Sequence, residues 1–166
     1  MGVFFFGHAL VQMPRYANAL RGALAAQCVT TALVVFAMKP TRSLRAWYRT
    51  LGVGAVTLDV LSLSLGAYIG LAAHDRLAAQ VGIAVLVGVV HDLAFGYLVR
   101  STPSGRNRAI DLFQRYADEK RLRIVLDDAL MIAGAVIAAR ALARSPHADA
   151  TAALAAYVNV LLVYAY

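Results

Sequence analysis

Four aspartates stand inside apolar segments of the chain, where a charged side chain is costly, and a histidine precedes one of them. Ionisable residues within membrane-spanning helices face the interior of a bundle, and they mark either pairing or an ion path. The sequence therefore predicts an intramembrane polar layer. Its members are Asp59, His91, Asp92, Asp127 and Asp128.

Several kinds of chemistry fit this layer, and the residue types leave them open. The carboxylates could accept hydrogen bonds from Ser, Tyr or backbone groups, or pair with arginines, which is a structural role. They could instead carry protons or cations, with His91 as a titrating partner. A metal site built from His91, Asp92 and Asp127 lacks any recognisable ligand spacing, and an aspartate pair acting as acid and base has no supporting motif. We expect no catalytic residue, no metal and no cofactor.

The composition indicates which elements must position these side chains. Of the 166 residues, 61% are hydrophobic and only 15% are charged, whereas a soluble domain is about half apolar and about a quarter charged. Segments of about 20 apolar residues can cross a bilayer core of about 30 Å as helices. We predict an all-α, polytopic membrane helical bundle with four to five transmembrane helices in a single domain, 1–166. The predicted spans are 22–38, 51–73, 77–99, 124–143 and 148–166.

Small residues share a helix face with each acid. Residues three, four or seven apart lie on one side of a helix, and glycines recur at these intervals from Asp59, Asp92 and Asp127. Such faces let membrane helices approach closely. We therefore expect the carboxylates to point into helix contacts that these glycines form. The predicted packing glycines are Gly66, Gly70, Gly88, Gly96 and Gly134.

The basic residues are concentrated in two connections, the loop 39–50 and the segment 100–123, which hold eleven of the 16 Lys and Arg. Five spans would place both connections on one side, and the positive-inside rule makes that side cytoplasmic, with the N-terminus opposite. Trp47 and Tyr48 are expected to anchor at the headgroup level. The arginines expected to contact partners or headgroups are Arg42, Arg45, Arg49, Arg106, Arg108 and Arg115.

The second basic connection has helical periodicity. Ile110, Phe113 and Ala117 recur at helical spacing, while the charged residues fall on other faces. This pattern predicts an amphipathic helix on the cytoplasmic side, which either docks at the membrane surface or extends the fourth span. The basic residues form no single stripe interleaved with aromatics, so we expect a lipid bilayer and not nucleic acid as the partner.

One set of motifs resembles a known family. The block Pro103–Glu119, the run Asp127–Ile132 and the ending Asn159–Tyr164 are similar to small multi-pass membrane proteins of nucleocytoplasmic large DNA viruses. The resemblance implies residence in the internal membrane of the virus particle and a structural or assembly role. It also implies contacts with neighbouring membrane or capsid proteins, possible oligomers and no enzymatic residues. The alternatives are a small proton or cation channel subunit that uses the acidic layer, and an accessory subunit of an organellar membrane complex.

Overall fold

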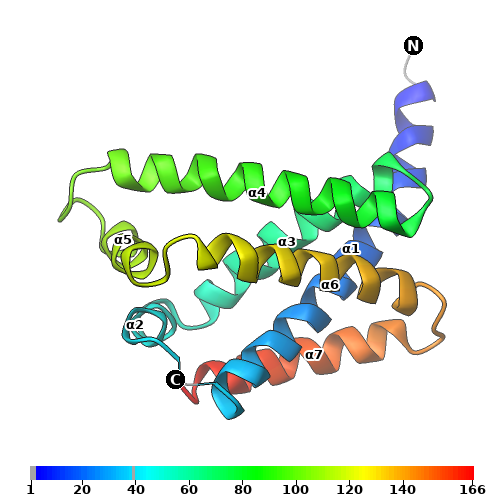
Figure 1. Cartoon of the computed structure of the whole chain (residues 1–166). Coiled ribbons are helices and arrows are strands. Elements are labelled where there is room, and N and C mark those ends of the chain that lie inside the picture. Colours follow the sequence, from blue (N-terminus) through cyan, green and yellow to red (C-terminus); the bar gives the residue numbers. More distant parts are fainter. Residues whose placement is uncertain (1–2, 39) are drawn as a thin grey trace.

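The computed structural model describes the backbone of residues 3–38 and 40–166, and the side chains from Pro14 onward within those ranges. Every regular element in this part of the chain is a helix, which confirms the all-α fold class (Figure 1). The elements are α1 (Val3–Phe36), α2 (Arg42–Leu51), α3 (Val53–Ala73), α4 (Leu77–Ser101), α5 (Arg108–Lys120), α6 (Arg123–Leu142) and α7 (Ala148–Val163).

The five long helices cover the five predicted apolar segments, and the amphipathic pattern after Ala109 corresponds to α5. Most boundaries lie within three residues of the prediction, and two features differ more. The first helix begins at Val3, well before the predicted start at Gly22. The segment 42–51, which we expected to be a loop, is the helix α2, because the Thr41 side chain accepts a hydrogen bond from the Leu44 amide and so caps its N-terminus.

Successive long helices run in opposite directions, so their ends gather at two opposite ends of the bundle (Figure 1). The short helices α2 and α5 pack against each other at one end, which we call the α2/α5 end. The connections 74–76 and 143–147 lie at the other, which we call the turn end. The two basic connections therefore share one end of the molecule. Helix α1 packs against α3, α6 and α7, and α4 packs against α3 and α6.

Small residues bring the helices together. Ile132 of α6 is 4% exposed, and its Cδ1 lies in a hole formed by two glycines. If Gly66 or Gly88 carried a Cβ, this Cδ1 would lie 3.0 Å from the Cβ of residue 66 and 2.5 Å from the Cβ of residue 88. A Cβ on Gly70 would overlap the Gln80 carbonyl oxygen of α4. Gly134 makes an ordinary contact with the Ala26 side chain of α1. These four predicted glycines lie on packed faces.

Gly96 does not fit the prediction. A Cβ at this position would meet no described atom within 4 Å, so no neighbouring helix packs closely against this glycine. The closest approach instead involves Gly22 of α1, which is not among the predicted packing glycines. A Cβ there would overlap the backbone of Ala135 and Ala139 in α6. The spacing of Ala19, Gly22, Ala23 and Ala26 carries the small-residue signal that would have identified this face.

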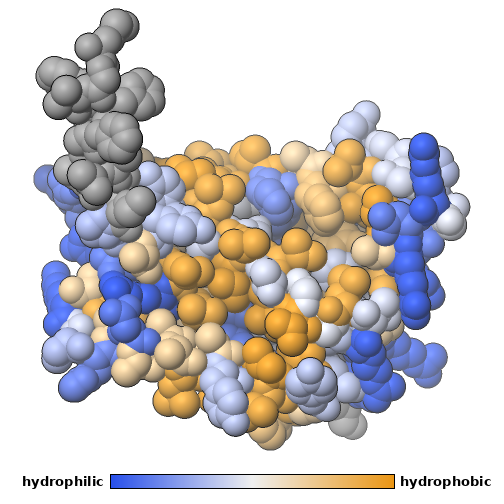
Figure 2. All heavy atoms as spheres, turned by 180° about the vertical axis from the view of Figure 1, so that it is seen from behind, coloured by the Kyte–Doolittle hydropathy of each residue, from blue (hydrophilic) through white to orange (hydrophobic). Residues whose placement is uncertain are grey.

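An apolar belt surrounds the middle of the bundle. Figure 2 shows hydrophobic side chains between two hydrophilic ends, and the large apolar residues of α4, such as Leu86, Val90 and Leu93, are more than half exposed. In the described part of the chain, three segments are long and apolar enough to cross a membrane: Pro14–Phe36, Val53–Ala73 and Leu77–Ser101. Helix α6 includes four charged residues, and α7 has 16 residues, or about 24 Å at helical rise.

Candidate polar site at the α2/α5 end

Asp59 belongs to a hydrogen-bond network that three helices build. Its Oδ2 accepts a hydrogen bond from the Tyr48 hydroxyl at 2.9 Å and a longer one from the Gln27 amide at 3.4 Å. Gln27 also donates to the Tyr48 hydroxyl oxygen at 3.1 Å and to the Thr31 hydroxyl at 3.3 Å. Gln27, Thr31 and Tyr48 are each less than 7% exposed. The carboxylate is thus bound by donors from α1 and α2.

Tyr48 links this network to the end of the chain. Its ring stacks on Tyr166 at 4.5 Å between ring centroids, and the neighbouring Arg49 donates from Nε to the main-chain oxygen of Tyr166 at 2.7 Å. Burial, followed by the negative charge of Asp59, raises the pKa of the Tyr48 hydroxyl far above its usual value. The hydroxyl therefore stays protonated and donates to Asp59. The expectation that Tyr48 anchors at the headgroups is wrong, because its ring is buried in this contact.

The other acids each have a different environment. Asp92 lies 3.2 Å from Nδ1 of His91, whose ring is half exposed and stacks on Phe95. Asp127 pairs with the Lys120 ammonium at 3.1 Å, not with the arginines we expected, because the turn between α5 and α6 returns Lys120 over the start of α6. Asp128 makes no ion pair in the described residues.

Although they do not bind one another, the aspartates gather around the same end. Asp128 interacts electrostatically with Asp92, Asp59 and Asp127. Tyr116 of α5 lies near the same aspartates. Burial, and then the negative charges of Asp128, Asp127 and Asp59, raise the pKa of its hydroxyl. The four aspartates of the predicted layer therefore lie near one another at the α2/α5 end.

Aromatic contacts and one carboxylate hold α2 and α5 together. Trp47 meets Phe113 edge to face at 5.8 Å, and Phe113 meets Phe95 of α4 at 4.8 Å. Trp47 is partly buried and contributes to the packing of α2 against α5, while its role as a headgroup anchor stays a prediction. Glu119 accepts hydrogen bonds from the free backbone amides of Arg42 and Ser43 in the first turn of α2, at 3.3 and 3.1 Å.

The Glu119 contact is electrostatically favourable. Hydrogen bonding by the Ser43 side chain, and then by the backbone amides of Ser43 and Arg42, lowers the pKa of Glu119. An anion at a helix N-terminus also interacts favourably with the helix dipole. Glu119 therefore acts as an N-terminal cap that one amphipathic helix supplies to the other.

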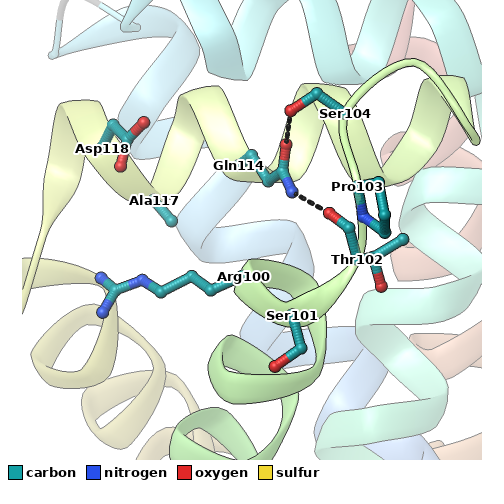
Figure 3. Close-up of a pocket in the computed structure, with 8 residues that line it drawn as sticks. All are labelled: Arg100, Ser101, Thr102, Pro103, Ser104, Gln114, Ala117 and Asp118. Carbon is teal, nitrogen blue, oxygen red and sulfur yellow. Dashed lines mark hydrogen bonds between the residues drawn. The ribbon is translucent and has the colours of Figure 1, made fainter.

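The turn between α4 and α5 encloses an open cleft of about 380 Å³ (Figure 3). The Gln114 amide donates to the carbonyl oxygens of Val99 and Thr102, and its oxygen accepts a hydrogen bond from Ser104. Gln114 thereby supplies a side-chain donor to two carbonyls at the C-terminus of α4. Arg100 extends along the same cleft (Figure 3). These polar groups bind one another and position α5 across the end of α4.

The six arginines expected to contact partners or headgroups are all exposed at this end of the bundle: Arg42, Arg45, Arg49, Arg106, Arg108 and Arg115. Among the described residues, no group of three His, Cys, Asp or Glu side chains is arranged to hold a metal ion. In particular, Asp127 turns to Lys120 and not to His91 and Asp92. Toward the turn end the buried core is mostly aliphatic. Its polar members are Ser64, whose hydroxyl donates to the Leu61 carbonyl of its own helix, and Gln80, whose amide donates to the His74 carbonyl oxygen.

Sequence reasoning missed Gln27, Tyr48 and Lys120 as partners of the acids. Gln27 interrupts an apolar run in α1, and a lone amide there is a signal of a buried hydrogen bond. Asn159 of α7 carries the same signal, since it is fully buried and donates to the Leu24 carbonyl oxygen at 3.1 Å.

No family model, no curated protein and no solved structure matches this chain.

Proposed function

We propose that this chain is a structural integral membrane protein whose α2/α5 end forms a basic contact surface for neighbouring proteins and lipid headgroups. The observation that carries the proposal is the combination of three membrane-length apolar helices with two amphipathic helices that pack together across one end. The six exposed arginines on and beside these two helices supply the positive charge. A rigid helical body with a charged cap suits a scaffold.

The orientation follows from the same charges. Basic connections remain on the cytoplasmic side of a membrane, so the α2/α5 end faces the cytoplasm and the turn end faces the opposite side. We further propose that α6 and α7 also cross the bilayer, giving five spans. Their antiparallel packing against the three apolar helices supports this count, and the Lys120–Asp127 ion pair and Arg140 lie near the ends of α6, where charges can reach the headgroups.

The membrane of residence is the most specific part of the proposal. The similarity of three motifs to membrane proteins of large DNA viruses supports the internal membrane of a virus particle, where a basic inner or outer surface would contact membrane or capsid proteins. The motif block Pro103–Glu119 coincides with the α4–α5 turn and α5. The part of the chain that carries the resemblance is thus a part of the proposed contact surface.

Photocrosslinking tests the contact surface. A photoreactive residue is placed at Arg45 of α2 or Arg106 beside α5 in the full chain, and a matched control is placed at the exposed Arg76 of the turn end. We expect defined crosslinks to membrane or capsid proteins in purified particles from the first two positions and none of the same crosslinks from the third. Identical crosslinks from all three positions, or release of the chain from membranes by alkaline carbonate, would overturn the proposal.

A proton or cation channel subunit is the second candidate, and the buried Gln27–Tyr48–Asp59 network favours it. The clustering of the acids at one end and the mostly aliphatic core beyond them favour the scaffold. Asp59→Asn separates the two, because asparagine keeps the size and accepts the Tyr48 hydrogen bond but cannot ionise. For a scaffold we expect no specific flux in liposomes from the parent and unchanged particle incorporation of the variant. Parent flux that the variant abolishes would make the channel the function.

A further inference from the structure

A second cleft lies at the turn end, opposite the site described above. Its volume is about 330 Å³, at the lower limit of small-molecule sites. Three arginines line it: Arg15 of α1, and, more than 120 residues later in the sequence, Arg140 of α6 and Arg144 of the α6–α7 turn. Leu71, Ala139 and Ala143 form an apolar part of its wall. The cleft thus combines concentrated positive charge with an apolar surface.

The hydrogen-bonding capacity of these arginines is largely unused. Arg15 donates one long hydrogen bond to the Ala72 carbonyl oxygen at 3.4 Å, and Arg140 donates one to the Asp75 carbonyl oxygen at 3.3 Å. None of the three forms an ion pair within the described part of the chain, although the carboxylate of Asp75 belongs to the lining. A guanidinium has five N–H donors, so most of them remain available to a ligand.

A buried acceptor lines the same cleft. Gln80 is 2% exposed, and its amide nitrogen donates to the His74 carbonyl oxygen at 2.6 Å. That hydrogen bond fixes the amide and leaves Oε1 buried with no partner among the described residues. A buried oxygen without a donor is unfavourable, and a ligand hydroxyl beside the arginines would satisfy it.

We propose that this cleft binds a phosphate ester that carries a free hydroxyl, and that the natural ligand is the headgroup of an anionic glycerophospholipid. Guanidinium forks match phosphate oxygens with two parallel hydrogen bonds. A hydroxyl is a better donor to Gln80 than an ammonium would be, because three arginines repel a cation. The cleft lies at the turn end of the bundle and is lined in part by Leu71, Ala139 and Ala143, so this apolar wall can contact the glycerol region of the lipid.

Native mass spectrometry of the full chain, extracted from vesicles with an equal mixture of lipids, tests the site. The three lipids are phosphatidylglycerol, phosphatidylmethanol, which has the same charge but no hydroxyl, and phosphatidylcholine. We expect retention in that order. Arg140→Gln and Arg144→Gln should each lower phosphatidylglycerol retention about tenfold. Arg76→Gln, at the same end but outside the cleft, is the matched control and should change nothing.

Gln80→Leu tests the hydroxyl contact by itself. We expect this variant to retain phosphatidylglycerol only as well as it retains phosphatidylmethanol. Trp47 fluorescence shows that the variant is folded. Competition with glycerol phosphate identifies the source of the ligand. If the soluble ester displaces the lipid completely, the phosphate site stands and its occupant is soluble. Equal retention of all three lipids, or an Arg76→Gln effect as large as that of Arg140→Gln, would overturn the proposal.

Discussion

Replacing Gly88 by alanine tests whether a glycine hole holds the bundle together. The added Cβ would lie 2.5 Å from Cδ1 of Ile132, closer than real Cβ atoms approach other heavy atoms. Ile132 is buried between α3 and α4, so its side chain can move only by disturbing its neighbours. Gly88→Ala should therefore destabilise the fold even though it adds a single methyl group.

Two opposing effects set the change in the free energy of unfolding that Gly88→Ala causes. Overpacking in a filled core costs about 1–3 kcal/mol, whereas replacing glycine by alanine in a helix gains about 0.5–1 kcal/mol. Gly96→Ala in the same helix measures the gain alone, because a Cβ there meets nothing within 4 Å. We expect the free energy of unfolding of Gly88→Ala to lie about 1–3 kcal/mol below that of Gly96→Ala.

A second substitution tests the cause of this loss. Ile132→Val removes the clashing Cδ1 and leaves Cγ1 at 3.8 Å from the Gly88 Cβ position, which is an ordinary contact. By itself it should cost about 0.5–1.5 kcal/mol. In the double variant, Gly88→Ala should destabilise the fold much less than it does in the parent. The favourable coupling free energy between residues 88 and 132 should be about 1 kcal/mol or more.

Unfolding in mixed micelles with increasing dodecyl sulfate, followed by circular dichroism and by fluorescence, gives the four free energies. Trp47 is the only tryptophan, so its emission reports the tertiary structure. Additive effects of Gly88→Ala and Ile132→Val would refute the reasoning, because they would mean that the two residues do not share the contact. Equal stabilities of Gly88→Ala and Gly96→Ala would refute it as well.

Two further predictions concern the α2/α5 end. The lowered pKa of Glu119 means that its contact with α2 is fully present above the ordinary glutamate pKa of about 4.3 and is lost as the pH falls through the lower folded value. Trp47 emission should change over that range, and Glu119→Gln should remove the acid transition. An identical transition in the variant would contradict this assignment. Single cysteines that replace Ser43, Ser104 or a residue of the turn end, each in a Cys28→Ser background, test the topology with an impermeant thiol reagent. The reagent should label positions 43 and 104 from one side of the membrane and the turn end from the other. Labelling of positions 43 and 104 from opposite sides would exclude the proposed topology.

The sequence by itself determined the helical elements, because hydropathy and helical periodicity are local properties. The predicted spans 51–73, 77–99 and 124–143 differ from α3, α4 and α6 by at most two residues at any boundary. The parity of the spans also placed both basic connections at one end, since short turns force neighbouring helices to run in opposite directions. The helix α2 was missed because ten residues rich in arginine carry no span signal, and its cap at Thr41 is visible only as a single residue type.

Tertiary structure alone decided which side chains meet. Asp59 is bound by Tyr48 and Gln27, residues 11 and 32 positions away, because α1 and α2 pack against the start of α3. Gly96 and Gly88 share one stripe, yet only Gly88 faces α6, since a helix face is packed only where a neighbour covers it. The cleft at the turn end has the same origin. Its arginines come from the first half of α1, from the last turn of α6 and from the turn that follows α6, and no local pattern specifies that these segments adjoin.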